Sequence, residues 1–95
     1  MYGSIFNLKP KKEKKQALID TLGDNSSVPD GGVAWLVMNP DSNEDLIAIA
    51  IFKDKESYKL NAEKPETHSN FIKMMSYLEE EPVWNDGSFI ISEFN

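Results

Sequence analysis

Two short stretches of continuous apolar sequence constrain the fold most strongly. Residues 33–38 (VAWLVM) and 46–52 (LIAIAIF) are typical of buried strands, and the turn-forming residues 39–45 between them predict an antiparallel hairpin. Successive side chains of a strand point to opposite faces of the sheet, so both faces of this hairpin are apolar. Any fold of the chain must therefore cover both faces.

The remaining segments predict two more strands and two or three helices around this hairpin. They are expected at residues 2–8 (strand), 12–22 (helix), 54–62 (short helix), 65–80 (helix) and 88–94 (strand). Gly23 is expected to stop the first helix, Asp54 to cap the short helix and Pro65 to open the long one. The order β-α-β-β-α-β predicts a ferredoxin-like α+β sandwich with a four-stranded antiparallel sheet, as one domain over residues 1–95.

Helices on one face of such a sheet leave the second face uncovered. The two apolar strands would expose several hundred Å² there, which is about the largest apolar patch that a monomer normally shows. We therefore expect a homodimer in which two sheets pack face to face.

The composition excludes several classes of partner and site. The net charge is −6, and all ten basic residues are lysines, so no guanidinium group is present to grip phosphates or bases, and no nucleic acid is expected. The chain has no cysteine, no stretch of about 20 apolar residues and no signal-peptide pattern, so we expect a cytoplasmic protein without a membrane partner. Half of the lysines lie in residues 9–15. This run is interpreted as an exposed helix start, and the alternative is a docking site for an anionic partner.

Three segments carry a resemblance to a known family: MYGSIFNLKPKKEKK at the start, FKDKESYKLNAEKPETHSNF, and EEEPVWNDG. With them the chain resembles the antibiotic biosynthesis monooxygenase-like group of the dimeric α/β-barrel superfamily. The resemblance implies two ferredoxin-like subunits whose sheets form one eight-stranded barrel, with a pocket between the helices and the sheet of each subunit. It also implies that no cofactor is needed, because members include cofactor-independent oxygenases of quinols and polyketides.

Other members of the family degrade haem, and this chain departs from their pattern. That branch carries an asparagine on the first strand, a tryptophan after the third strand and a histidine on the last helix. The matching positions here are Ser4, Tyr58 and His68, so haem binding is not expected.

His68, Asn61 and Tyr58 are the candidate catalytic residues. His68 lies one turn before Phe71 and is expected on the buried side of its helix, where a neutral imidazole could accept a substrate proton. Asn61 and Tyr58 are three residues apart and share one face of the short helix, where they could orient a carbonyl and form an aromatic wall. The alternatives are structural: a packed histidine, an aromatic plug in the core and a helix cap.

Four apolar side chains are candidates for the wall of a substrate pocket, namely Trp35, Phe71, Met75 and Trp84. The tryptophans could stack on a small aromatic ligand, and the alternative is that they anchor the core or an interface. Acidic residues 79–81 have no histidine at ligand spacing, so no metal site is expected, and Asp86 with Gly87 is interpreted as a turn. The two functions that remain are a cofactor-independent monooxygenase of phenolic or quinol-type substrates and a non-catalytic ligand-binding or interaction module.

Overall fold

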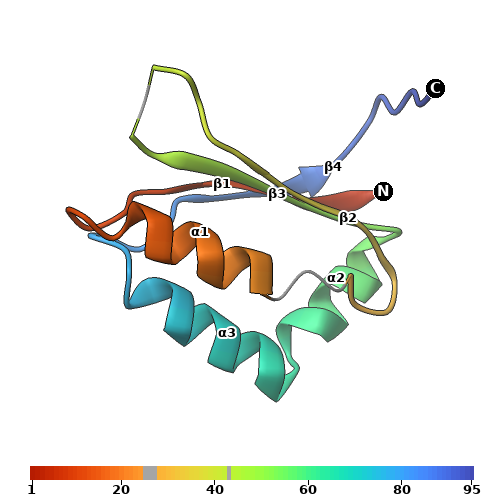
Figure 1. The fold of residues 1–95 in the computed structure, drawn as a ribbon. Helices are drawn as coiled ribbons and strands as arrows, with labels where there is room; N and C mark the ends of the chain where they lie inside the picture. The colour runs from red at the N-terminus through yellow and green to blue at the C-terminus, as the bar shows by residue number, and fades with distance from the viewer. Residues whose placement is uncertain (25–27, 43) are drawn as a thin grey trace.

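The computed structural model describes residues 1–24, 28–42 and 44–95 and shows three helices packed on one face of an open four-stranded antiparallel sheet (Figure 1). The strands are β1 (Tyr2–Leu8), β2 (Gly32–Met38), β3 (Leu46–Phe52) and β4 (Trp84–Ser88), in the spatial order β2-β3-β1-β4. The helices are α1 (Lys15–Asp24), α2 (Lys55–Ala62) and α3 (Pro65–Met75). The predicted ferredoxin-like α+β class is confirmed. Within the described segments, no helix has both the length and the hydropathy needed to cross a membrane.

The hydrophobic core lies between this face of the sheet and the helices α1 and α3. Alternation along β1 turns Phe6 and Leu8 toward the helices, and Leu46 of β3 lies beside them in the β1–β3 register. Leu18 of α1 and Met74 of α3 close this core from the helix side. The sheet and the two helices thus share one apolar layer, as expected for a two-layer sandwich.

The predicted start signals of α2 and α3 are confirmed. Asp54 caps α2, because its side chain accepts a hydrogen bond of 2.8 Å from the N–H of Ser57. The same backbone hydrogen bond is the main reason that the pKa of Asp54 lies below its usual value. Pro65 is the first residue of α3, where its missing N–H costs nothing. The hairpin of β2 and β3 is also confirmed, although residue 43 of its turn lies outside the described residues.

The first helix starts and ends later than predicted. The N–H of Lys14 bonds to the carbonyl of Lys11 in a turn, and Glu13 in that turn has a φ of 65°, so α1 begins only at Lys15. Gly23 lies inside α1 and does not stop it. A glycine that ends a helix usually has a positive φ, and among the described residues the glycine with a positive φ is Gly31. The lysine-rich run therefore lies mainly in the connection before α1.

The last helix ends five residues before the predicted residue 80. Beyond Ser76 the chain turns back toward the segment that follows β1: Leu78 bridges Pro10, and the N–H of Glu79 donates to the carbonyl of Lys9. These bonds satisfy backbone groups that a longer helix would have paired internally. A contact distant in sequence thus sets the end of α3.

The last strand lies earlier in the chain than predicted. It was expected at residues 88–94, but β4 covers Trp84–Ser88 and the residues from 89 onward form no regular element. β4 pairs with β1, and in this register Ser88 lies opposite Tyr2 at the start of the chain. The N–H of Phe89 still bonds to the carbonyl of Met1, just outside the paired residues of the two strands.

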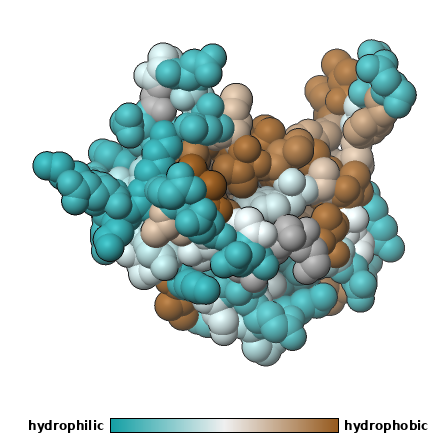
Figure 2. Space-filling model, in the orientation of Figure 1, coloured by the Kyte–Doolittle hydropathy of each residue, from teal (hydrophilic) through white to brown (hydrophobic). Residues whose placement is uncertain are grey.

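The second face of the sheet is apolar, as predicted, and in the single chain it is uncovered (Figure 1). Ile5, Leu36 and Met38 point to this face and are 40, 54 and 51% exposed. Figure 2 shows apolar side chains gathered on the sheet side and along the C-terminal extension, which carries Ile90, with 90% exposure, and Phe94. We call the uncovered face of the sheet the open sheet face. Its central residue is Ile49, which lies opposite both Ile5 and Leu36.

Candidate functional site

A cavity of about 1020 Å³ lies between the sheet and the helix layer. Its sheet side comes from all four strands, and its helix side comes mainly from α2 and α3. A small side chain on the inner strand β3 leaves room for it: Ala50 lines the cavity between its register partners, Ser4 on β1 and Trp35 on β2. The volume lies at the upper end of the range for small-molecule pockets.

Aromatic side chains form one wall of the cavity. Phe6 is central, with its ring centroid 4.3 Å from that of Trp84 and 6.2 Å from that of Trp35. The centroid of Phe71 on α3 lies 6.0 Å from that of Trp84. Phe6 and Trp84 are direct cross-strand partners, so the β1–β4 register creates their contact. The four rings offer flat apolar surface to a ligand, and we call them the aromatic wall.

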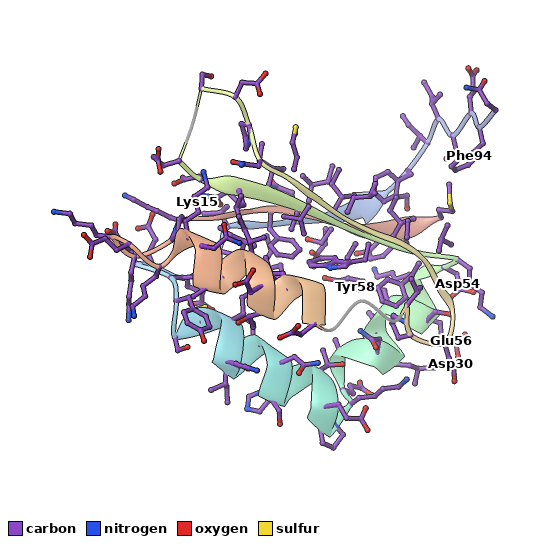
Figure 3. All side chains as sticks on the ribbon, in the orientation of Figure 1. Lys15, Asp30, Asp54, Glu56, Tyr58 and Phe94 are labelled. Atoms are coloured by element: carbon purple, nitrogen blue, oxygen red, sulfur yellow. The ribbon has the colours of Figure 1, made fainter. Side chains whose placement is uncertain are left out.

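Tyr58 provides the main polar contact inside the site. It extends from α2 into the space between helices and sheet (Figure 3), and its ring makes edge contacts with Tyr2 and Phe52 at centroid distances of 5.3 and 5.6 Å. Its hydroxyl donates a hydrogen bond of 3.1 Å to Oδ1 of Asp86. The pKa of Tyr58 is raised to about 12, mainly by burial and further by this hydrogen bond and the charge of Asp86. Tyr58 is therefore a protonated donor at neutral pH.

Ser4 lies beside this pair and is almost completely buried, with 1% exposure. It is the β1 partner of Asp86, and both residues line the cavity. Its hydroxyl makes no hydrogen bond of good geometry within the described part of the chain, although it lies near enough to Tyr58 to lower the pKa of that phenol slightly. A buried hydroxyl without a partner is costly, and it marks a place where a small rearrangement or a ligand would be favourable.

His68 borders the cavity, but it is exposed and does not lie on the buried side of α3 as predicted. The inward stripe of α3 consists of Thr67, Phe71 and Met74, which follow the helical spacing i, i+4 and i+7. His68 is one residue, or about 100°, away from that stripe. Its side chain has no hydrogen-bond partner among residues 1–24, 28–42 and 44–95.

The structure brings six of the seven candidate residues to this one cavity: Trp35, Tyr58, Asn61, His68, Phe71 and Trp84. Met75 does not line it; Met74 does, and Met75 instead packs against the core from the neighbouring helix position. The role of each side chain toward a ligand stays a prediction.

Asp86 was missed, because the pair Asp86-Gly87 was interpreted as a turn. Both residues lie within β4, and the alternation of the strand places Trp84 and Asp86 on the same face. The sequence signal that could have identified Asp86 is its position two residues after Trp84 on the same strand. No group of three or more potential metal ligands occurs in the described part of the chain.

Comparison with solved structures identifies the fold. A candidate antibiotic biosynthesis monooxygenase from Nitrosomonas europaea superposes with a TM-score of 0.82 at 12% identity, over 96% of this chain and 100% of that protein. Another candidate antibiotic biosynthesis monooxygenase, from Deinococcus radiodurans, has a TM-score of 0.77 at 12% identity over the full length of both chains. A conserved protein from Methanosarcina mazei reaches 0.76 at 18% identity, over 90% of this chain and 89% of its own length.

The chain therefore has the fold of antibiotic biosynthesis monooxygenase-like proteins, and the resemblance seen in the sequence is confirmed at the level of the fold. No protein-family model matches the sequence, and no curated protein does. At these identities the likeness shows architecture, and a fold of this kind hosts different functions.

Proposed function

We propose that the chain binds a flat aromatic molecule in the cavity between sheet and helices. The aromatic wall carries this proposal, because four rings from three strands and one helix converge on a single apolar surface. Polar groups at the edges, among them Tyr58, Asn61 and His68, would fix the orientation of the ligand.

The chemistry we propose is oxygenation of an electron-rich phenol or quinol without a metal. The names of the structural neighbours support this class of reaction. His68 would take the phenolic proton, and the amide of Asn61 would donate a hydrogen bond to the resulting oxyanion. The electron-rich anion would then reduce O₂. For a phenol, one oxygen atom enters the ring to give a quinone, and the other leaves as water with the two hydrogens that the substrate loses.

A non-catalytic ligand-binding module of the same fold is the second candidate. It is favoured by the position of His68, which is exposed and lacks an orienting partner in the described part of the chain. General bases are usually held in place by a third group.

Turnover and affinity measured together separate these two functions. Oxygen uptake and quinone absorbance are followed with naphthols and naphthoquinols, and affinity is measured by calorimetry in the absence of oxygen. For the enzyme we expect His68→Ala to lose turnover and keep affinity, while Ser69→Ala, an exposed neighbour on α3, keeps both. Binding by the wild type without oxygen uptake would support the module, and absence of binding would refute both.

We further propose that two copies pair through the open sheet face. The exposure of Leu36 and Met38 supports this, because a sheet with apolar side chains on both faces is stable when both are covered. Sedimentation velocity at micromolar concentration tests it, and a well-folded monomer would contradict it.

A further inference from the structure

We propose that Asp86 selects the ligand of the cavity by accepting a hydrogen bond from a hydroxyl or ammonium group on the aromatic ring. The preferred ligands are then neutral phenols and arylalkyl ammonium ions, and aromatic carboxylates are disfavoured. This inference rests on the proposed function, because it requires that aromatic molecules bind in the cavity, and it concerns the neutral or cationic ligand as it binds, before His68 takes any proton.

The position of Asp86 relative to the aromatic wall is the first argument. Asp86 and Trp84 are two residues apart on β4 and point to the same face, which places them about 7 Å apart along the strand. A ring bound against Trp84 and Phe6 would therefore have an edge toward the carboxylate. A substituent on that edge would reach Asp86, and one on the opposite edge would not.

The hydrogen bonding of Asp86 is the second argument. Tyr58 donates to Oδ1, whereas Oδ2 has no partner among the described residues, and no lysine there forms an ion pair with Asp86. The carboxylate is thus held in place by one bond and free to accept another. A charged acceptor forms stronger hydrogen bonds than a neutral one.

Ser4 supplies the third argument, because its buried hydroxyl lacks a partner and lies beside Tyr58. When Tyr58 gives its hydrogen to Asp86, its oxygen can accept the hydrogen of Ser4, which otherwise has no partner in the described chain. After a small shift of the Ser4 hydroxyl, a chain of donors would run from Ser4 through Tyr58 to Asp86. Its free end is an acceptor, so it matches a ligand that donates.

The charges around the cavity agree with this preference. The carboxylates of Asp30, Glu66 and Asp86 line it together with a single ammonium group, that of Lys64, within the described part of the chain. The excess of negative charge disfavours an anionic ligand and favours a cationic one beside aromatic rings.

Four probes with the same ring system test the proposal: 2-naphthol, 2-naphthylmethylamine, 2-methylnaphthalene and 2-naphthoate. We expect calorimetry to show that the wild type binds the naphthol and the amine about tenfold more tightly than 2-methylnaphthalene, and 2-naphthoate most weakly. Asp86→Asn should remove this advantage and leave the affinity for 2-methylnaphthalene unchanged. Asp30→Asn is the matched control: it also removes one lining carboxylate, and the preference for the naphthol should persist.

A second variant distinguishes the carboxylate from the phenol beside it. Tyr58→Phe leaves both oxygens of Asp86 free, so the preference for the donor ligands should remain. A preference that is lost in Tyr58→Phe but kept in Asp86→Asn, or an equal loss in Asp30→Asn and Asp86→Asn, would overturn the role of Asp86. If 2-methylnaphthalene binds and the ring substituent makes no difference, the selection is wrong while the proposed binding function stands. If none of the four binds, the binding function fails and this inference fails with it.

Discussion

The substitution Tyr58→Phe separates the contribution of one hydroxyl from that of the ring. The ring makes edge contacts with Tyr2 and Phe52, and phenylalanine keeps both. What is lost is the hydrogen bond of 3.1 Å to Asp86. Because Asp86 is exposed and water competes for its carboxylate, we expect the free energy of unfolding to fall by about 1 kcal/mol. In a domain of this size that corresponds to a fall in Tm of roughly 4–8 °C.

The pH dependence of this difference gives a second, sharper result. The pKa of Tyr58 is raised from 10.0 to about 12 in the folded chain, so its stabilising effect is present below pH 10 and is lost as the pH rises from 10 to 12. The full shift would correspond to about 2.7 kcal/mol, and the partial exposure of the side chain reduces this to about 1 kcal/mol. The stability gap between the wild type and Tyr58→Phe should therefore close across that window.

Urea unfolding monitored by tryptophan fluorescence between pH 7 and pH 12 measures both effects. Tyr77→Phe is the control, because Tyr77 is partly buried against the core and its hydroxyl makes no hydrogen bond to the described residues. Its difference from the wild type should be small and constant with pH. A Tyr58→Phe variant as stable as the wild type at pH 7, or a gap that persists at pH 12, would refute the contact with Asp86.

The backbone of the sheet and its open face give further expectations. Gly3→Ala should prevent stable folding, because the new methyl group would overlap the carbonyl of Ala50 on β3, and circular dichroism measures the loss. Gly23→Ala is the matched change in α1, where nothing lies within 4 Å, so we expect a gain of about 0.5 kcal/mol in urea unfolding; a loss there would show that the helix ends earlier. Ile49→Asp places a carboxylate at the centre of the open sheet face and should abolish dimers and lower stability. Sedimentation that still shows a stable dimer would mean that another surface pairs.

Local chemistry made much of the fold predictable from the sequence. The apolar runs defined β2 and β3, Asp54 capped α2, and Pro65 opened α3 because each signal acts within a few residues. The element ends that failed depend on distant partners. α3 stops where Leu78 pairs with the segment after β1, and the position of β4 follows from its pairing with β1.

Strand alternation and helical spacing made part of the candidate site predictable from the sequence. Trp84 was recognised as part of a wall, yet Asp86 two residues later was read as a turn, because the turn preference of Asp-Gly was considered without its pairing to β1. His68 was placed on the inward side from its distance to Phe71, but Thr67 occupies that stripe. A rotation of one residue along a helix decides between a buried base and an exposed one.

The occupant of the cavity is tested most directly by the indole signals of the two tryptophans, which are the only ones in the chain and both line it. In ¹H–¹⁵N correlation spectra we predict that 2-naphthol shifts the indole N–H of Trp35 and Trp84 together, in a saturable way, along with the backbone amides of Tyr58 and Asn61. Signals that stay in place at millimolar 2-naphthol, or shifts confined to Ile49 and its neighbours on the open sheet face, would contradict an aromatic-binding cavity.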